Sequence, residues 1–347
     1  MRSKIHAIDL FCGVGGLSCG LQEAGINVVA GYDIDSSCKA TFEANISAPF
    51  ILKDVKKVTG AELIGRYPKS GLRLLAGCAP CQPFSRHMRG ADTSKDDKWS
   101  LLDEFSRLVR EARPDFVTME NVTGLRRTAV FIRFTKSLEK MGYSVEHRSC
   151  YGPRFGLAQH RRRLVLVASC RGTVSPIQDL LSENFPTVRD VIGELMPLEA
   201  GGQSDSDPLH KARALTEINI RRLKASKPGG TWQDWPEELR APCHRKSSGS
   251  SFQSVYARMS WDEPSPTITT QSFNFGTGRF GHPEQDRAIT LREAALLQGF
   301  PPGYKFLGRK EELQFTVIGK HIGNAVPPPL GLAVGQHFLR HALNESR

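Results

Sequence analysis

The sequence predicts an α/β fold, a doubly wound Rossmann-like sheet accompanied by a second, smaller and irregular domain. Short apolar runs alternate with helical patterns through the first half of the 347 residues, which indicates βαβ units and a mostly parallel sheet. Three glycines follow the first apolar run directly, as they do where such a sheet approaches a ligand. From about Gly172, Pro, Gly, Ser and Arg become frequent and the periodicity fades, which indicates the second domain.

Each expected element rests on its own local pattern. The strands are short apolar runs, and the helices repeat apolar residues every three to four positions. The second expected element, a helix, is stopped by Gly25, and the last expected helix follows Pro327–Pro329, which suit a helix start better than its interior. In chain order, the expected strands are 5–11, 28–32, 51–52, 72–76, 116–119 and 164–168, and the expected helices are 17–24, 37–44, 101–110, 131–141 and 330–343.

These patterns divide the chain into three expected parts. Residues 1–171 form the sheet domain, which is expected to carry the cofactor and the chemistry. Residues 172–316 form the irregular domain, and residues 317–347 return to the sheet domain as a helical segment.

Composition favours a polyanionic partner. Lys and Arg number 47 against 36 Asp and Glu, a formal net charge of +11, so nucleic acid is the first candidate and a merely basic soluble protein the alternative. The eight cysteines show no framework spacing, which fits a reducing compartment. The start of the chain lacks a signal-peptide pattern, and no apolar run approaches the ~20 residues of a membrane span. A soluble protein of the cytoplasm is therefore expected.

The first strands end in residues suited to a nucleotide-like ligand. Gly13, Gly15 and Gly16 lie between a strand and a helix, although a tight structural turn is the alternative because the full G-x-G-x-x-G spacing is absent. Asp33 ends the next strand and could hold ribose hydroxyls, or could cap the helix that follows. Asp54 could receive an adenine amino group or cap a turn. Together they favour an adenosine-containing cofactor, of a dehydrogenase or of a methyltransferase.

A loop cysteine is the candidate nucleophile. Cys81 stands between Pro80 and Gln82, directly after an expected strand, where such folds place their chemistry. The alternative is a zinc or redox pair with Cys78, but no second C-x-x-C or histidine pair completes a metal set.

Two further segments supply candidate partners for that nucleophile. Glu120 ends an apolar strand, where a carboxyl group with a raised pKa could donate a proton. Strand alternation would place Arg161 and Arg163 on one side and Arg162 on the other, so that one of them reaches the catalytic pocket; a solvated basic turn is the alternative.

Over essentially its whole length, the chain resembles the bacterial type of cytosine-5 DNA methyltransferase. The matching motifs, in family order, are DLFCGVGG, APCQPFS, MENV, QHRRR, RAITLREAALLQGFP and IGNAVPPPL. Cys12, Ala79 and Ile34 stand where other residues are usual in the family, which concerns packing around the cofactor more than the chemistry.

The resemblance assigns roles to particular residues. It implies Cys81 as the nucleophile, Glu120 as the contact to the cytosine ring, and Arg163 as a residue that helps to hold the base and thiolate region. Arg161 is a further catalytic candidate from the QHRRR segment. It implies no metal ligands. The implied cofactor-binding residues are Phe11, Gly13, Gly15, Gly16, Asp33, Ile34, Asp54, Val55, Pro80, Asn324 and Val326, with Asn324 also bridging toward the catalytic loop.

The implied reaction is methyl transfer from S-adenosylmethionine to the 5-carbon of a cytosine in a specific double-stranded DNA sequence. A covalent Cys81 adduct, a flipped-out base and a lid over residues 83–99 are part of this expectation. The protein would be a monomer and the modification enzyme of a restriction-modification system, without a required protein partner. Residues 172–316 would recognise the DNA target, with candidate contacts at Arg245, Lys246, Arg258, Gln271 and Arg279.

Three other functions are weighed against this one. A tRNA cytosine-5 methyltransferase would share the motifs, but the large irregular domain favours DNA. A catalytically inactive DNA-binding regulator would not need every catalytic residue type. A nicotinamide dehydrogenase would explain the glycine turn but neither PCQ nor ENV.

Overall fold

A computed structural model describes residues 4–80, 100–246, 255–308 and 312–344. The chain divides into two compact units. The first comprises the described residues within 1–155, 162–180 and 325–347, and the second those within 156–161 and 181–324. None of the helices in the described ranges has the length and apolar character required to span a bilayer.

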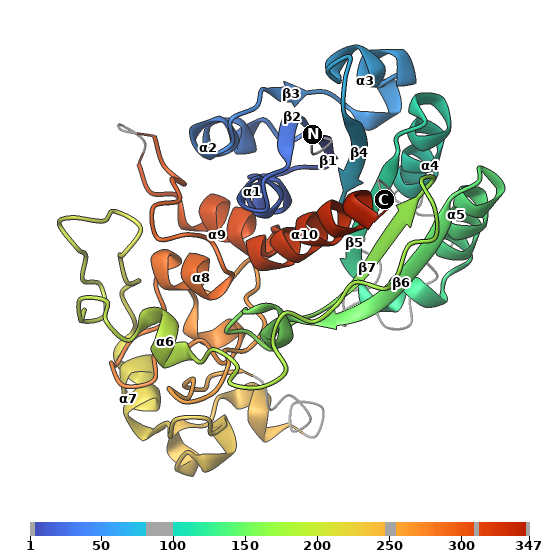
Figure 1. The fold of residues 1–347 in the computed structure, drawn as a ribbon. Helices are drawn as coiled ribbons and strands as arrows, with labels where there is room; N and C mark the ends of the chain where they lie inside the picture. Colours follow the sequence, from blue (N-terminus) through green and yellow to red (C-terminus); the bar gives the residue numbers. More distant parts are fainter. Residues whose placement is uncertain (1–3, 81–99, 247–254, 309–311, 345–347) are drawn as a thin grey trace. The chain divides into compact units, whose positions relative to one another are not determined.

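The first unit is built on a seven-stranded sheet with the order β3-β2-β1-β4-β5-β7-β6 (Figure 1). The first five strands along the chain run parallel, and β7 pairs antiparallel with both β5 and β6. The order reverses between β1 and β4, where doubly wound sheets bind ligands at the carboxyl ends of their strands. The strands are β1 (Ile5–Leu10), β2 (Asn27–Asp33), β3 (Phe50–Leu52), β4 (Leu72–Gly77), β5 (Phe116–Val122), β6 (Ser144–Tyr151) and β7 (Arg162–Ser169).

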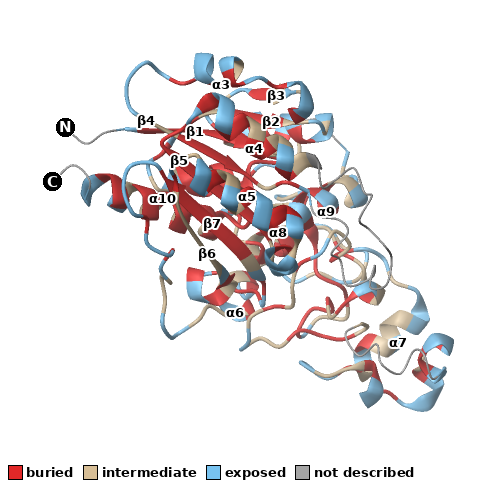
Figure 2. Cartoon of the chain, turned by 90° about the vertical axis from the view of Figure 1, so that its right-hand side faces the viewer, coloured by how far each residue is buried: buried red, intermediate tan, exposed pale blue. Residues whose placement is uncertain are grey.

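Helices cover both faces of this sheet. One face packs into a buried apolar core with α3 (Gly60–Arg66), α4 (Ser100–Ala112) and α5 (Ala129–Lys140). The other carries α1 (Gly16–Glu23), α2 (Lys39–Asn45) and α10 (Pro328–Asn344), with Phe338 of α10 stacked on Phe116 of β5 at 4.9 Å between ring centroids. Figure 2 shows the central strands buried and the outer helix surfaces exposed. Side chains of alternate strand residues thus enter opposite layers.

Glycines allow α1 and α10 to approach each other closely. A Cβ atom at Gly20 would lie 2.0 Å from the carbonyl oxygen of Pro328, and one at Gly16 would lie 2.1 Å from that of Val326. Only a residue without a Cβ fits these distances. The C-terminal helix therefore packs directly on the helix that begins at the glycine turn.

The second unit is mostly irregular. Its α-helices are α6 (Val188–Ile192), α7 (Glu217–Ala225), α8 (Leu291–Leu297) and α9 (Phe315–Asn324). One buried cluster joins Trp232, Trp235 and Phe275, with Leu223, Leu239 and Ala288. The buried Arg287 guanidinium donates to both carboxylate oxygens of Glu293 at 2.7 Å, which satisfies a charge that would otherwise be costly to bury.

The α/β fold with a doubly wound, mostly parallel sheet confirms the sequence prediction. Among the strands and α-helices of the described part of the first unit, β6 and α3 are not predicted by the sequence patterns. A third difference concerns β7, which begins at Arg162, two residues before the expected strand 164–168, and Arg161 precedes it.

Candidate active site at the carboxyl edge of the sheet

The turn after β1 adopts backbone conformations that glycine permits. Gly13 has φ 51° and Gly15 has φ 89°, and Gly15 is the N-cap of α1. Phe11 also has a positive φ, 59°, which is uncommon for a non-glycine residue and is frequently seen at functional sites. A Cβ at Gly13 would meet no protein atom within 4 Å, so this glycine serves the backbone conformation and not a close protein contact.

Asp33, at the end of β2, holds this turn in place. Its Oδ2 accepts the Gly13 N–H at 2.8 Å, and its Oδ1 accepts the Asp35 N–H at 2.9 Å. The cap of the following 3₁₀ helix η1 (Ser36–Cys38) is Asp35, whose carboxylate accepts the Ser37 N–H at 3.1 Å. The capping alternative for Asp33 is therefore wrong. Each Asp33 oxygen retains a lone pair for a ligand hydroxyl.

An apolar side chain stands beside this carboxylate. Ile34 is 69% exposed, although it follows a buried strand. An isolated exposed apolar residue is ordinary on a surface. Next to Asp33 it offers a flat ligand an apolar contact within reach of hydroxyl acceptors.

The turn after β3 is fixed from two sides. Asp54 accepts the Lys56 N–H at 2.9 Å and caps η2 (Val55–Lys57). The predicted turn-capping role of Asp54 is therefore confirmed. The second carboxylate oxygen of Asp54 remains for another donor. Arg107 of α4 donates to the carbonyl oxygens of Val55 and Val58 at 3.3 and 2.9 Å. The Arg107 side chain is itself paired with Glu104 and Glu111. Sequence reasoning did not identify Arg107, because no local motif links α4 to this turn.

A buried acid lies beneath the glycine turn. Asp9 of β1 accepts the Ser18 hydroxyl of α1 at 2.7 Å. Desolvation raises the pKa of Asp9 to about 7; the Ser18 hydrogen bond opposes the rise and the nearby negative charge of Asp33 adds to it. Asp9 was also missed from the sequence, although an acid inside an apolar strand is a recognisable signal.

Glu120 lies near the end of β5 and is 5% exposed. Its Oε2 accepts the thiol hydrogen of Cys78 at 3.1 Å. Its Oε1 lies 3.1 Å from Nε of Arg163, close enough for an ion pair. That approach does not meet hydrogen-bond geometry, and Oε1 accepts no hydrogen bond from the described residues. The two oxygens of one carboxylate therefore have different surroundings.

Asn121, the next residue, holds the segment that leads to the candidate nucleophile. Its Nδ2 donates to the carbonyl oxygen of Ala79 at 2.8 Å, and its Oδ1 accepts the Val122 N–H at 2.9 Å. Pro80 follows and is exposed. Cys81 itself, and the expected lid over residues 83–99, lie outside the described residues. The end of β5 thus fixes the two residues that precede Pro80.

The three arginines of QHRRR occupy different surroundings. Arg163 lies beside Glu120, whereas Arg162 is exposed, with its guanidinium 4.3 Å from the Tyr151 ring centroid. Arg161 belongs to the second unit and donates to the carbonyl oxygens of Ile268 and Gly323 at 3.2 and 3.4 Å. The expectation that Arg161 and Arg163 share one side of a strand is wrong, because Arg161 precedes β7.

The remaining candidates are distributed between the units. Val326 belongs to the first unit and is buried, whereas Asn324 ends α9 of the second unit and is exposed. Among the candidate DNA contacts, Arg258 is buried; it donates to three carbonyl oxygens and pairs with Asp286. A role for Arg258 in reaching a phosphate is therefore wrong. Arg245 and Lys246 are exposed, and Gln271 and Arg279 are partly exposed.

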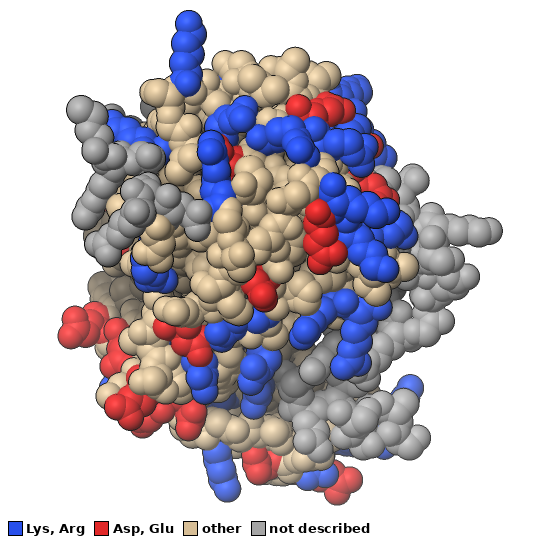
Figure 3. Space-filling view, turned by 45° about the vertical axis from the view of Figure 1, so that its right-hand side comes forward, with Lys and Arg blue, Asp and Glu red and all other residues tan. Residues whose placement is uncertain are grey.

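Basic side chains are exposed on one face of the molecule (Figure 3). Figure 3 shows Lys and Arg over much of one face, with Asp and Glu between them. The excess of Lys and Arg in the sequence thus has a counterpart among exposed side chains. Such a surface attracts a polyanion without identifying its sequence.

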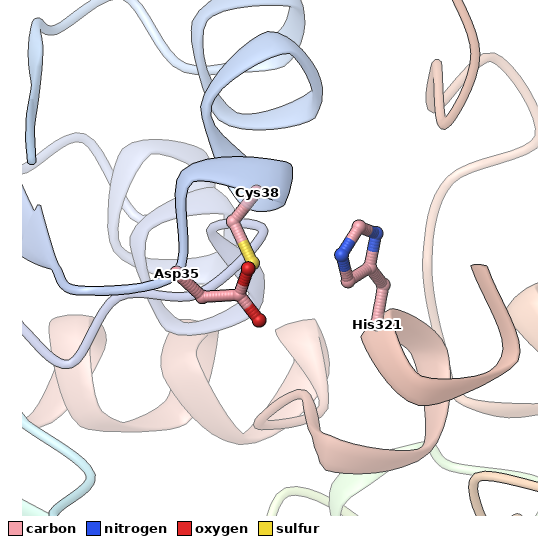
Figure 4. A group of neighbouring side chains, drawn as sticks. All are labelled: Asp35, Cys38 and His321. Carbon is pink, nitrogen blue, oxygen red and sulfur yellow. The ribbon is translucent and has the colours of Figure 1, made fainter. Parts of the chain in front are cut away.

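The η1 turn carries two further polar side chains, Asp35 and Cys38 (Figure 4). Asp35 is occupied as the helix cap, and Cys38 is buried. His321, drawn in the same figure, lies on α9 and belongs to the second unit.

Comparison with known proteins gives full-length matches. The family model described as C-5 cytosine-specific DNA methylase matches residues 5–340. The chain is 50% identical over 337 residues to the type II methylase M.HgiDII of Herpetosiphon aurantiacus, covering 96% of this chain and 94% of that protein. It is 31% identical over 343 residues to the type II methyltransferase M1.HphI of Haemophilus parahaemolyticus, covering 97% and 87%.

Solved structures agree at the level of the fold. A crystal structure of a DNA modification methyltransferase encoded within an E. coli prophage has a TM-score of 0.74 at 20% identity, covering 98% of this chain and 100% of that one. The S. pombe Dnmt2 methyltransferase has a TM-score of 0.66 at 17% identity, covering 98% and 99%.

Proposed function

The chain belongs to the C-5 cytosine-specific DNA methylase family, and on this premise we propose that it methylates the 5-carbon of a cytosine within a specific double-stranded DNA sequence. The full-length similarity to two type II methylases supports its role as the modification enzyme of a restriction-modification system. The observation that carries the proposal is the end of β5, where Glu120 and Asn121 hold Cys78 and Ala79, directly before Pro80 and Cys81.

The described residues around the glycine turn fit S-adenosylmethionine, whose sulfonium supplies an activated methyl group. Asp33 retains acceptor capacity for ribose hydroxyls, and the exposed Ile34 offers an apolar surface for a purine. Asp54 has a second oxygen for an amino group, and Arg107 fixes the carbonyl of Val55 beside it. Phe11, Gly13, Gly15, Gly16, Pro80, Asn324 and Val326 complete the proposed cofactor set.

Cytosine requires activation because its 5-carbon is a weak nucleophile. We assign to Cys81 the addition of its thiolate to carbon 6 of the ring, and to Glu120 a hydrogen bond or proton at ring nitrogen 3. The ring then has enamine character, and carbon 5 can take up the methyl group. Loss of the 5-proton and expulsion of the Cys81 thiolate restore the aromatic ring.

We assign different parts to Arg163 and Arg161. The Arg163 guanidinium lies beside Oε1 of Glu120 and donates from one terminal nitrogen to the Arg162 carbonyl oxygen at 2.9 Å, which leaves three N–H positions that can meet the base. Arg161 is buried among backbone carbonyls, so its contribution is to order the segment that precedes β7.

The base must leave the duplex to meet a thiol, and this extrusion costs a few kcal/mol. Contacts with DNA offset that cost. We propose that the irregular second unit recognises the target sequence, with Arg245, Lys246, Gln271 and Arg279 as candidate contacts in addition to the phosphate contacts of other Lys and Arg residues.

The test is methyl transfer from labelled S-adenosylmethionine to duplex DNA and, in parallel, to tRNA. The wild type is expected to label DNA, and Cys81→Ser is expected to reduce incorporation to background, since an alcohol is a poor nucleophile without a strong base. Cys170→Ala, at an exposed cysteine away from the site, is the control. Labelling of tRNA alone would contradict the DNA proposal.

Trapping the enzyme separates chemistry from binding. A duplex containing 5-fluorocytosine should give a covalent adduct with the wild type and none with Cys81→Ser. Binding without an adduct in the wild type would favour a DNA-binding regulator. Methylation-sensitive sequencing of DNA from expressing cells would identify the recognised sequence.

A further inference from the structure

The Cys78 thiol has no part in the mechanism above, yet it contacts the carboxyl group that activates the ring. Cys78 directly follows β4, and Glu120 lies near the end of β5. These strands are parallel neighbours, and Gly77 is paired with Met119. The next pair in that register is Cys78 and Glu120. Their contact therefore follows from the sheet and does not depend on a loop conformation.

The contact distinguishes the two oxygens of Glu120. Oε2 accepts the thiol hydrogen at 3.1 Å, and Oε1 has Arg163 Nε at the same distance but accepts no hydrogen bond within the described part of the chain. A terminal carboxyl torsion is broad and roughly two-fold, so it needs an external contact to select one orientation. The thiol is such a contact.

We propose that Cys78 is a positioning residue for methyl transfer: its S–H holds Oε2 of Glu120, so that Oε1 is presented to the cytosine ring. This inference rests on the proposed function. It assigns to Cys78 a role separate from that of the Cys81 nucleophile, and it does not require the two cysteines to form a pair.

The kinetic test compares Cys78→Ala with Cys78→Ser. Alanine removes the donor, and we expect kcat to fall about three- to tenfold, the worth of one ordinary hydrogen bond, with KM for DNA and for S-adenosylmethionine nearly unchanged. Serine keeps a donor at the same place and should restore most of the lost rate. Cys170→Ala is the matched control for removing a cysteine.

A double-mutant cycle tests whether the effect acts through Glu120. In a Glu120→Gln background, Cys78→Ala should cause no comparable further loss, because the carboxylate that it orients is gone. Wild-type kcat in Cys78→Ala would overturn the inference. An equal loss in the serine and alanine variants, or an undiminished loss in the glutamine background, would overturn it as well.

A spectroscopic measurement tests the contact without reference to turnover. The infrared S–H stretch of Cys78, isolated as the difference between the wild type and Cys78→Ala, should lie at the lower frequency of a donating thiol and should rise in Glu120→Gln. An unshifted band would overturn the contact itself. Absence of cytosine methylation by the wild type would instead overturn the proposed function, and with it the positioning role.

Discussion

Burying a carboxyl group is costly unless hydrogen bonds or charges compensate for lost hydration. The first unit nevertheless buries Asp9 and Glu120 close to two strand ends. Glu120 has Cys78 and Arg163 beside it, whereas Asp9 has the Ser18 hydroxyl and a second carboxylate, Asp33, nearby. We assign the first arrangement to ring activation, as proposed above, and the second ties β1 to α1 beneath the glycine turn.

Asp9→Asn should change how stability depends on pH. Because the pKa of Asp9 is raised from 3.8 to about 7 in the folded state, the unfolded chain releases its proton first as pH rises. Titration of Asp9 therefore lowers the stability of the wild type as pH rises across this window, and Asp9→Asn lacks this contribution. Urea unfolding at about pH 5 and about pH 7.5 should show the variant gaining on the wild type by on the order of 2 kcal/mol.

Ser18→Ala is the control, since it keeps the titrating acid and removes its hydrogen-bond donor. It should lower stability while retaining the wild-type direction of the pH effect. A constant difference between Asp9→Asn and the wild type at both pH values would contradict a raised pKa at Asp9.

Strand ends explain which site residues the sequence could predict. Gly13, Asp33 and Glu120 each follow or end an apolar run, and topology brings such positions to one edge of a parallel sheet. The Cys78 contact could not be read in this way, because spacing along the chain suggested Cys81 as its partner. Arg161 was misplaced because strand alternation was extended one residue beyond the actual start of β7.

At the scale of elements, close helix packing depends on residues that lack side chains. Gly20 of α1 approaches the Pro328 carbonyl and the backbone of Gly331 and Leu332 in α10. The atoms concerned are backbone atoms, which cannot rotate away as a flexible side chain does. The helix that begins at the glycine turn therefore packs backbone to backbone against the C-terminal helix.

Gly20→Ala should be destabilising. The added methyl group would lie 2.0 Å from the Pro328 oxygen, so the helices must separate. We expect a loss of about 1–3 kcal/mol in the free energy of unfolding. Gly65→Ala in α3 is the matched control, because a Cβ there meets nothing within 4 Å and should stabilise the helix by about 0.5–1 kcal/mol. Equal effects of the two substitutions in denaturant unfolding would refute the packing argument.

The elements that the sequence did not predict, β6 and α3, have weak apolar periodicity. β6 (Ser144–Tyr151) is a partly buried edge strand of mixed polar and apolar residues, SVEHRSCY, so it lacks the apolar run of a central strand. α3 has only seven residues, which is too short for a clear helical period. The buried strands β1, β4, β5 and β7 were identified because both of their faces are covered.

For the whole molecule, histidines buried in each unit contribute to the dependence of stability on acid pH. His337 of α10 is 4% exposed, and His282 of the second unit is 1% exposed. Desolvation is the largest cause that lowers the pKa of each to about 4; nearby positive charge contributes, although Glu293 opposes the shift at His282. Both side chains are therefore neutral in the folded protein at neutral pH.

The contribution of these two histidines to the stability of the wild type should fall as pH falls from about 6.5 to about 4, since the unfolded chain protonates them in this window and the folded protein does not. His337→Met replaces one titrating group with an adaptable apolar side chain. Between about pH 7 and about pH 4.5, the variant should lose roughly 2 kcal/mol less than the wild type. Chemical denaturation at the two pH values measures this difference. The contributions of Asp9 and His282 cancel in the comparison because both proteins contain these residues. Parallel losses in the two proteins would show that His337 is protonated in the folded state as readily as in the unfolded chain.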